Sequence, residues 1–103
     1  MKHPKTFIFM DIPCEIFIEE YEGNGQAAIS LITTETEWTV AGEPMATASV
    51  CIPDMNFQEG QTALKTWSEN EGLYEALVQA GVVKATGRMA YAGNMPCPIV
   101  QIQ

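Results

Sequence analysis

The segment Ser68-Glu69-Asn70-Glu71-Gly72-Leu73-Tyr74-Glu75-Ala76-Leu77-Val78-Gln79-Ala80-Gly81-Val82 carries the clearest local signal in the chain. Ser68 and Glu71 stand three residues apart, the spacing of a capping box in which the N-cap hydroxyl and the N3 carboxylate each satisfy a backbone amide. Leucine and alanine then recur at helical spacing, and Gly81 followed by an apolar residue is typical of a Schellman stop. We therefore predict a helix over about Glu69–Ala80, with Ser68, Glu71 and Gly81 as its structural caps.

Outward from the helix, the chain reads as strands. Apolar and polar residues alternate with the two-residue period of a half-buried strand, and the runs are separated by glycine- and proline-containing turns, including one at Thr86-Gly87. We expect about five strands, taken from the segments Cys14–Tyr21, Gln26–Thr34, Met45–Ile52, Thr62–Trp67, Arg88–Tyr91 and Ile99–Ile102.

These elements predict an α+β protein: an antiparallel sheet of about five strands with one helix packed on one face. A single late helix argues against alternating βαβ units, which build parallel sheets. The length of 103 residues suits one domain, residues 1–103. Hydrophobic residues make up 47% of the chain, enough for a core and too many for intrinsic disorder.

The charge balance bears on the class of partner. Thirteen acidic residues against five Lys and Arg give a formal net charge of −8. Such a chain repels phosphate backbones and anionic lipids, so we expect no direct binding to nucleic acid or membrane. A basic protein partner, including one whose groove holds nucleic acid, would suit this charge. The alternative is that the charge only keeps the protein soluble.

The sequence holds few residues suited to catalysis or metal binding. Its three cysteines are widely spaced, with no CxxC pair, and its one histidine, His3, lies in an N-terminal stretch that we expect to be flexible. A zinc site needs several closely spaced ligands, and nucleophilic catalysis needs a positioned base. We therefore expect no enzyme activity, no metal and no cofactor. Because no signal segment or bilayer-length apolar run is found, we expect a cytoplasmic protein with reduced thiols.

Acidic residues gather in the first half of the chain, near candidate apolar anchors. Carboxylates around aromatic side chains are suited to docking on a basic, apolar-lined groove. The alternative is that the two aromatic residues are partly buried in the core. The predicted interface consists of Glu15, Glu19, Glu35, Glu37, Trp38 and Phe57.

The helical segment also carries a family resemblance. The stretch Trp67–Arg88 resembles a family of uncharacterised proteins of about this length from bacteria, phages and mobile elements, a domain of unknown function. Turns at Gly23–Gln26 and Gly42–Pro44 fit the same pattern, so that the resemblance extends over Tyr21–Arg88. No activity or catalytic residue comes with that family. The resemblance implies a setting in which small acidic proteins bind and block host proteins.

Three functional hypotheses follow. The first is a non-catalytic protein-binding module, an inhibitor or accessory factor of a mobile element that acts on a basic host protein. The second is a structural subunit that self-associates through an edge strand such as the C-terminal one, forming a homo-oligomer. The third is a small-molecule-binding protein with a pocket between helix and sheet.

Overall fold

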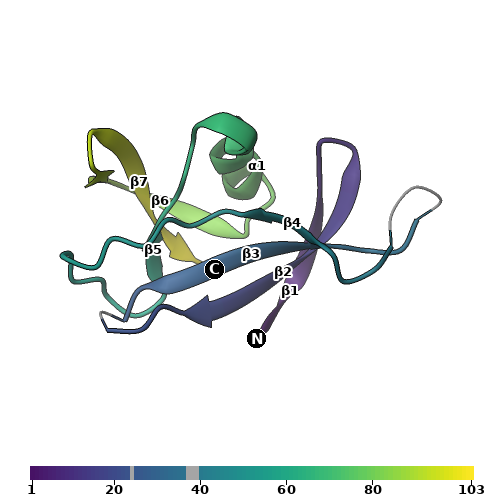
Figure 1. The fold of residues 1–103 in the computed structure, drawn as a ribbon, viewed down its shortest axis with the longest axis horizontal. Helices are drawn as coiled ribbons and strands as arrows, with labels where there is room; N and C mark the ends of the chain where they lie inside the picture. The colour runs from purple at the N-terminus through teal and green to yellow at the C-terminus, as the bar shows by residue number, and fades with distance from the viewer. Residues whose placement is uncertain (24, 37–39) are drawn as a thin grey trace.

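A computed structural model describes residues 1–23, 25–36 and 40–103. The described residues form an α+β fold with two antiparallel sheets, shown in Figure 1. The first sheet has the order β1-β2-β3-β4, and its strands are β1 (Lys2–Phe9), β2 (Ile12–Glu20), β3 (Ala27–Thr33) and β4 (Pro44–Thr47). The second has the order β5-β7-β6, and its strands are β5 (Gln61–Ala63), β6 (Val83–Ala92) and β7 (Met95–Ile102). The predicted fold class is confirmed, but the described chain forms seven strands in two sheets rather than about five in one.

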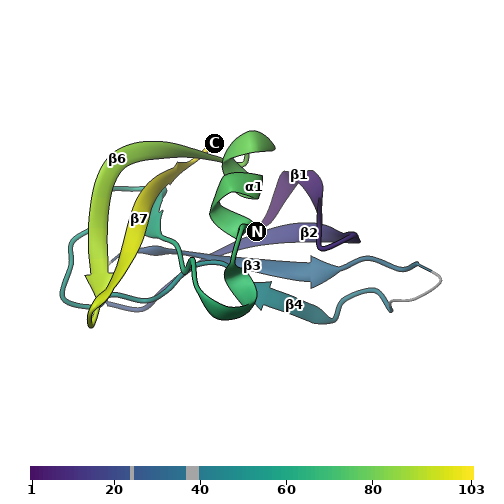
Figure 2. The same ribbon diagram turned by 90° about the horizontal axis from the view of Figure 1, so that it is seen from above.

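The helix α1 (Leu73–Gln79) lies over the first sheet, between the β6–β7 hairpin and β1 (Figures 1 and 2). It buries Leu73 and Leu77 in the larger of two hydrophobic cores. That core also contains Ile16 and Leu31 from the first sheet and Val100 from the second. The helix therefore fills the angle between the sheets instead of covering one face of a single sheet.

The prediction for the helix start is wrong. Residues Ser68–Asn70 form a 3-10 turn, and α1 begins only at Leu73, after Gly72 in a left-handed conformation with φ 83°. Ser68 is itself left-handed, with φ 60°, and the Glu71 amide donates to the Ser68 backbone carbonyl at 3.2 Å, with no capping bond to the Ser68 hydroxyl among the described residues. The predicted capping box of Ser68 and Glu71 is therefore absent, because the backbone does not enter the helix at Ser68.

The end of the helix agrees with the prediction. Gly81 has φ 76°, its amide donates to the Val78 carbonyl, and the Val82 amide donates to the Leu77 carbonyl, each at 3.0 Å. This pair of bonds defines a Schellman motif. Leu77 and Val82 are both fully buried, which supplies the apolar contact that accompanies the motif.

The N-terminal stretch is an ordered strand rather than a flexible end. His3 is only 5% exposed. Its Nδ1 accepts from the Lys5 amide at 3.1 Å, and its Nε2 lies 2.7 Å from the Gln103 carbonyl oxygen. Nδ1 is thus the acceptor, and Nε2 carries the proton that bonds Gln103. The histidine fastens the first strand to the last residue of the chain.

Two further differences concern the C-terminal hairpin. The predicted turn at Thr86-Gly87 lies inside β6, where the register with β7 shifts between Ala85 and Met89. Gly87 adopts φ 79° at this bulge. The C-terminal strand β7 lies in the middle of the second sheet, so it is not an edge available for self-association.

A buried glutamine links the sheets. The Gln26 side chain donates to the Val50 carbonyl at 2.7 Å and to the Thr62 hydroxyl at 2.9 Å, and it accepts from the Ile52 amide at 2.9 Å. These bonds join the start of β3, the loop after β4 and the strand β5. Because Gln26 is fully buried, its bonds replace those that the amide would make with water.

Candidate functional site

The outward face of β2 and β3, termed here the outer face, presents carboxylates beside apolar side chains. Glu15, Phe17 and Glu19 alternate with the buried residues of β2, and Phe17 lies opposite Ser30 in the register. Phe17 and Ile32 are half-buried, although no helix or second sheet of the described residues covers this face of the strands (Figure 1). With Glu19, Ser30 and Gly42 they line a shallow depression of about 410 Å³.

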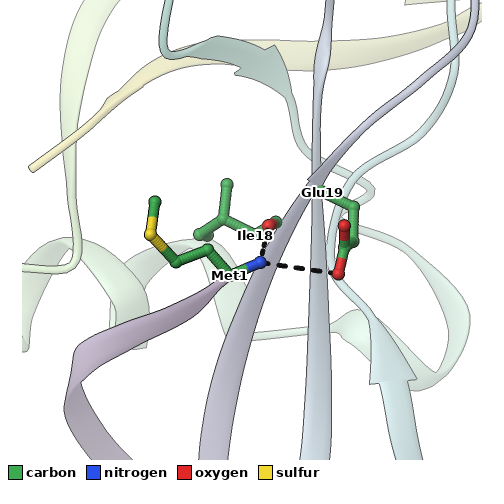
Figure 3. A network of polar contacts seen from close by, with 3 residues as sticks. All are labelled: Met1, Ile18 and Glu19. Atoms are coloured by element: carbon green, nitrogen blue, oxygen red, sulfur yellow. Dashed lines mark hydrogen bonds and ion pairs between the residues drawn. The ribbon is translucent and has the colours of Figure 1, made fainter.

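The two carboxylates of the outer face differ in their partners. Glu15 is half-buried and pairs with Lys2 on β1 at 3.4 Å. Glu19 is exposed and lies 3.5 Å from the Met1 amino group, which also donates to the Ile18 carbonyl (Figure 3). Both pairs lie at the surface, so each adds little to stability, and a partner can compete for the carboxylates.

A second depression lies beside the first at Glu19. It has a volume of about 540 Å³ and lies between the end of the first sheet and the β5–β7 edge of the second. Ile18, Ala27 and Ile102 form its apolar walls, and Glu19, Glu20 and Glu59 contribute carboxylates. The acidic surface therefore continues from the outer face around the end of β2.

The structure separates the remaining predicted interface residues from this surface or leaves them undescribed. Glu35 is exposed just after β3, beside the start of β2, where the Thr34 amide donates to the Pro13 carbonyl at 3.2 Å. Phe57 is half-buried against the smaller core of Ala63, Ala90, Cys97 and Ile99 under the second sheet, so it is a core residue. Glu37 and Trp38 lie outside the described residues.

Phe17 and Ile32 are the surface residues that the predicted interface missed. The signal was present in the alternation of β2, which places Phe17 on the same face as Glu15 and Glu19. The alternation therefore leaves an aromatic side chain between two carboxylates on the outer face.

A third depression, termed here the helix–hairpin groove, lies between α1 and the β6–β7 hairpin. Its volume is about 340 Å³. Tyr74 and Glu75 line it from α1, and Arg88, Met89, Pro96 and Pro98 line it from the hairpin. Arg88 makes no ion pair among the described residues, and Glu69 pairs with Lys65 at 2.7 Å.

The described residues hold no group of three or more His, Cys, Asp or Glu side chains placed to bind a metal ion. Their three cysteines are all free, and burial raises the pKa of the Cys14 and Cys97 thiols. Cys51 is exposed. The helices among the described residues are too short to cross a membrane.

No protein-family model, curated protein or solved structure matches this chain.

Proposed function

We propose that this chain is a small, acidic, non-catalytic protein-binding module that docks on a basic partner through its outer face. The observation that supports this function is the placement of two half-buried apolar side chains beside carboxylates: Phe17 lies between Glu15 and Glu19 on β2, and Ile32 lies opposite Glu15 on β3. Apolar anchors inside a charged rim are the usual composition of a protein interface.

The charge of the whole chain supports the same kind of partner. With a net charge of −8, the molecule attracts positively charged surfaces at long range and accelerates their encounter. The acidic second depression, which shares Glu19 with the outer face, enlarges the area that a basic partner would meet. The family resemblance of Trp67–Arg88 suggests the biological context of this binding. In that context the protein is an inhibitor or accessory factor, encoded by a mobile element, that acts on a basic host protein.

The test is affinity capture from a lysate of the natural host with matched charge reversals. The first variant is Glu15→Lys with Glu19→Lys, which alters the outer face. The control is Asp54→Lys with Glu71→Lys, two exposed residues elsewhere that change the net charge by the same amount. We expect the unaltered protein and the control to retain a basic protein that the first variant loses.

Ionic strength provides a second readout. The captured protein should be released between roughly 50 and 300 mM salt, because screening between exposed charges strengthens over that range. If both variants capture the same proteins as the parent, the outer face is not the interface. Capture that resists salt and charge reversal would instead indicate an apolar contact.

A further inference from the structure

The strand β6 is an edge of the second sheet. It pairs with β7 on one side, and among the described residues no strand pairs with it on the other. An open edge leaves backbone N–H and C=O groups able to bind another extended chain. Which residues of β6 present those groups follows from the register.

The register places the free backbone groups at Met89 and Tyr91. The Pro98 carbonyl accepts from the Leu64 amide at 3.0 Å, so the backbone of Pro98 faces the β5 side of β7. In an antiparallel pair of strands, the N–H and C=O of one residue point to the same side of its strand. Where these groups point away from the neighbouring strand, the two residues opposite each other form a non-hydrogen-bonded pair, and both turn their backbone groups away from each other. Met89 pairs with Pro98 and Tyr91 with Pro96, so both residues point their backbone groups away from β7.

The two prolines support this reading. Proline has no N–H, and Pro96 and Pro98 occupy positions of β7 where the bond to β6 is not needed. Neither Met89 nor Tyr91 has a backbone hydrogen-bond partner among the described residues. The free edge therefore offers two donors and two acceptors to an incoming strand.

The side chains at this edge are apolar and exposed. Met89 is 50% exposed and Tyr91 is 61% exposed, and both lie on the same face of the hairpin. Met89 lines the helix–hairpin groove together with Tyr74 and the two prolines. Natural edge strands are normally protected by charge or by a covering segment, and exposed apolar side chains are not such protection.

The charge of the edge indicates the chemistry of the occupant. Lys2 and Lys65 pair with glutamates, and Lys5 donates to the Ala80 and Gly81 carbonyls. Lys84 and Arg88, both on β6, are exposed and make no ion pair among the described residues. In a chain of net charge −8, β6 is thus locally positive.

We propose that the free edge of β6 at Met89 and Tyr91 binds an extended segment of a partner protein that alternates apolar and acidic side chains. The segment adds as a fourth strand beside β6, with an apolar side chain in the helix–hairpin groove and a carboxylate at Arg88. This site is separate from the outer face and selects the opposite charge in its ligand.

The experiment selects peptides from a displayed library of random ten-residue sequences on the immobilised full chain and maps the best one by backbone amide chemical shifts. We expect enriched peptides that alternate apolar residues with Asp or Glu and that shift the Met89 and Tyr91 amides most. No enrichment over a blank surface, enrichment of basic peptides, or shifts centred on another element would overturn the proposal.

Two substitutions at one position separate backbone from side-chain contributions. Tyr91→Pro removes the outward N–H and leaves the hydrogen bonds to β7 intact, whereas Tyr91→Ala removes only the side chain. Binding should be lost in the first and weakened in the second. If Tyr91→Pro does not fold, a selected peptide with every second amide N-methylated tests the same bonds on the parent protein. Equal binding with and without methylation would exclude strand addition.

Two further substitutions test the charge preference. Arg88→Gln should lower the affinity for the acidic peptide about threefold. Glu75→Gln, on the opposite wall of the groove, should raise that affinity about twofold. Changes in the same direction would contradict the assigned position of the carboxylate. Sedimentation of the protein alone provides the last comparison: self-association that Tyr91→Pro abolishes would show a second copy, not a partner segment, at this edge.

Discussion

At the scale of single residues, Glu69 shows how a local pair changes protonation. Its carboxylate bonds the Lys65 ammonium at 2.7 Å, and this bond is the main cause that lowers the pKa of Glu69 to about 2 from 4.5. Lys65 also lies 5.9 Å from the centre of the Trp67 ring, and its side chain is only 26% exposed. The aromatic contact helps to hold the ammonium in place.

The depressed pKa predicts a pH dependence with a definite sign. A carboxyl whose pKa is lower in the folded state stabilises the fold above about pH 4.5, and this contribution is lost as pH falls toward about 2. Titration of the Glu69 carboxyl carbon by NMR should give the low value, and Lys65→Met should raise it toward 4.5. Lys84→Met serves as the control and should leave it unchanged. A parent value near 4.5 would contradict the pair.

His3 is a second residue whose role depends on its surroundings. From sequence it appears as a lone histidine near the chain start, where little restricts a side chain. In the fold it is buried and bonded at both ring nitrogens. Its position was not predictable, because both the burial and the bond to Gln103 depend on pairing between distant parts of the chain.

At the scale of elements, the two ends of α1 differ in how well the sequence predicts them. The Schellman stop was predictable because its residues lie within one turn and glycine is suited to positive φ. The start was not, because Gly72 takes the left-handed conformation that ends the 3-10 turn before α1 begins. Asn70 explains part of the difference: it is fully buried, and its amide donates to the Thr47 carbonyl on β4 at 2.8 Å. This contact ties the 3-10 turn to the first sheet.

Ser68 provides a test of this account. A capping serine replaced by glycine loses a few tenths of a kcal/mol, whereas a serine held at φ 60° without a capping bond gains from glycine. We expect Ser68→Gly to stabilise the fold by about 0.5 kcal/mol, because relief of left-handed strain exceeds the entropic cost of glycine. Chemical denaturation measures the difference, and a lower midpoint than the parent would favour the capping box.

The strands also differ in how well the sequence predicts them, because some are defined by a local pattern and others by pairing with distant segments. β2 and β3 were predicted nearly to their ends because strict alternation and a glycine-containing turn define both. The three-residue β5 and the N-terminal β1 have weaker patterns, and their pairing with β7 and β2 makes them strands. β4 is shorter than the predicted Met45–Ile52, because the chain changes partners there: the Ala48 amide still donates to the Ile29 carbonyl of β3, whereas Ser49 forms a bridge with Leu64, directly after β5.

At the scale of the whole molecule, Gln26 holds the two sheets in their arrangement. Three hydrogen bonds of its buried side chain join the start of β3 to the loop after β4 and to β5. Gln26→Ala removes them, so that the Val50 carbonyl and the Thr62 hydroxyl lose the amide group that donates to them. We expect a loss of roughly 3 kcal/mol in the free energy of unfolding, about 1 kcal/mol for each bond. Urea denaturation measures this free energy, and Gln58→Ala, at an exposed position, is the control. Equal losses of unfolding free energy in the two variants would contradict the linking role of Gln26.

The candidate interfaces also belong to this scale. Glu15 and Glu19 were predicted as members of one interface, and both lie on the same face of β2. Phe57 was included as a candidate aromatic anchor, and it packs against the smaller core, which was the alternative stated for it. The free edge at Met89 and Tyr91 is visible only once β6 is known to pair with β7 alone.

The amino-acid sequence by itself determined the features that depend on neighbours along the chain. These are the α+β class, the alternation of β2 and β3, the glycine stop at Gly81 and the acidic charge, all set by local backbone preference and composition. Only the tertiary structure decided the division into two sheets, the burial of His3, the late start of α1 and the free edge of β6. Each of these rests on hydrogen bonds and packing between segments far apart in sequence, where local preference is weak and the partner determines the conformation.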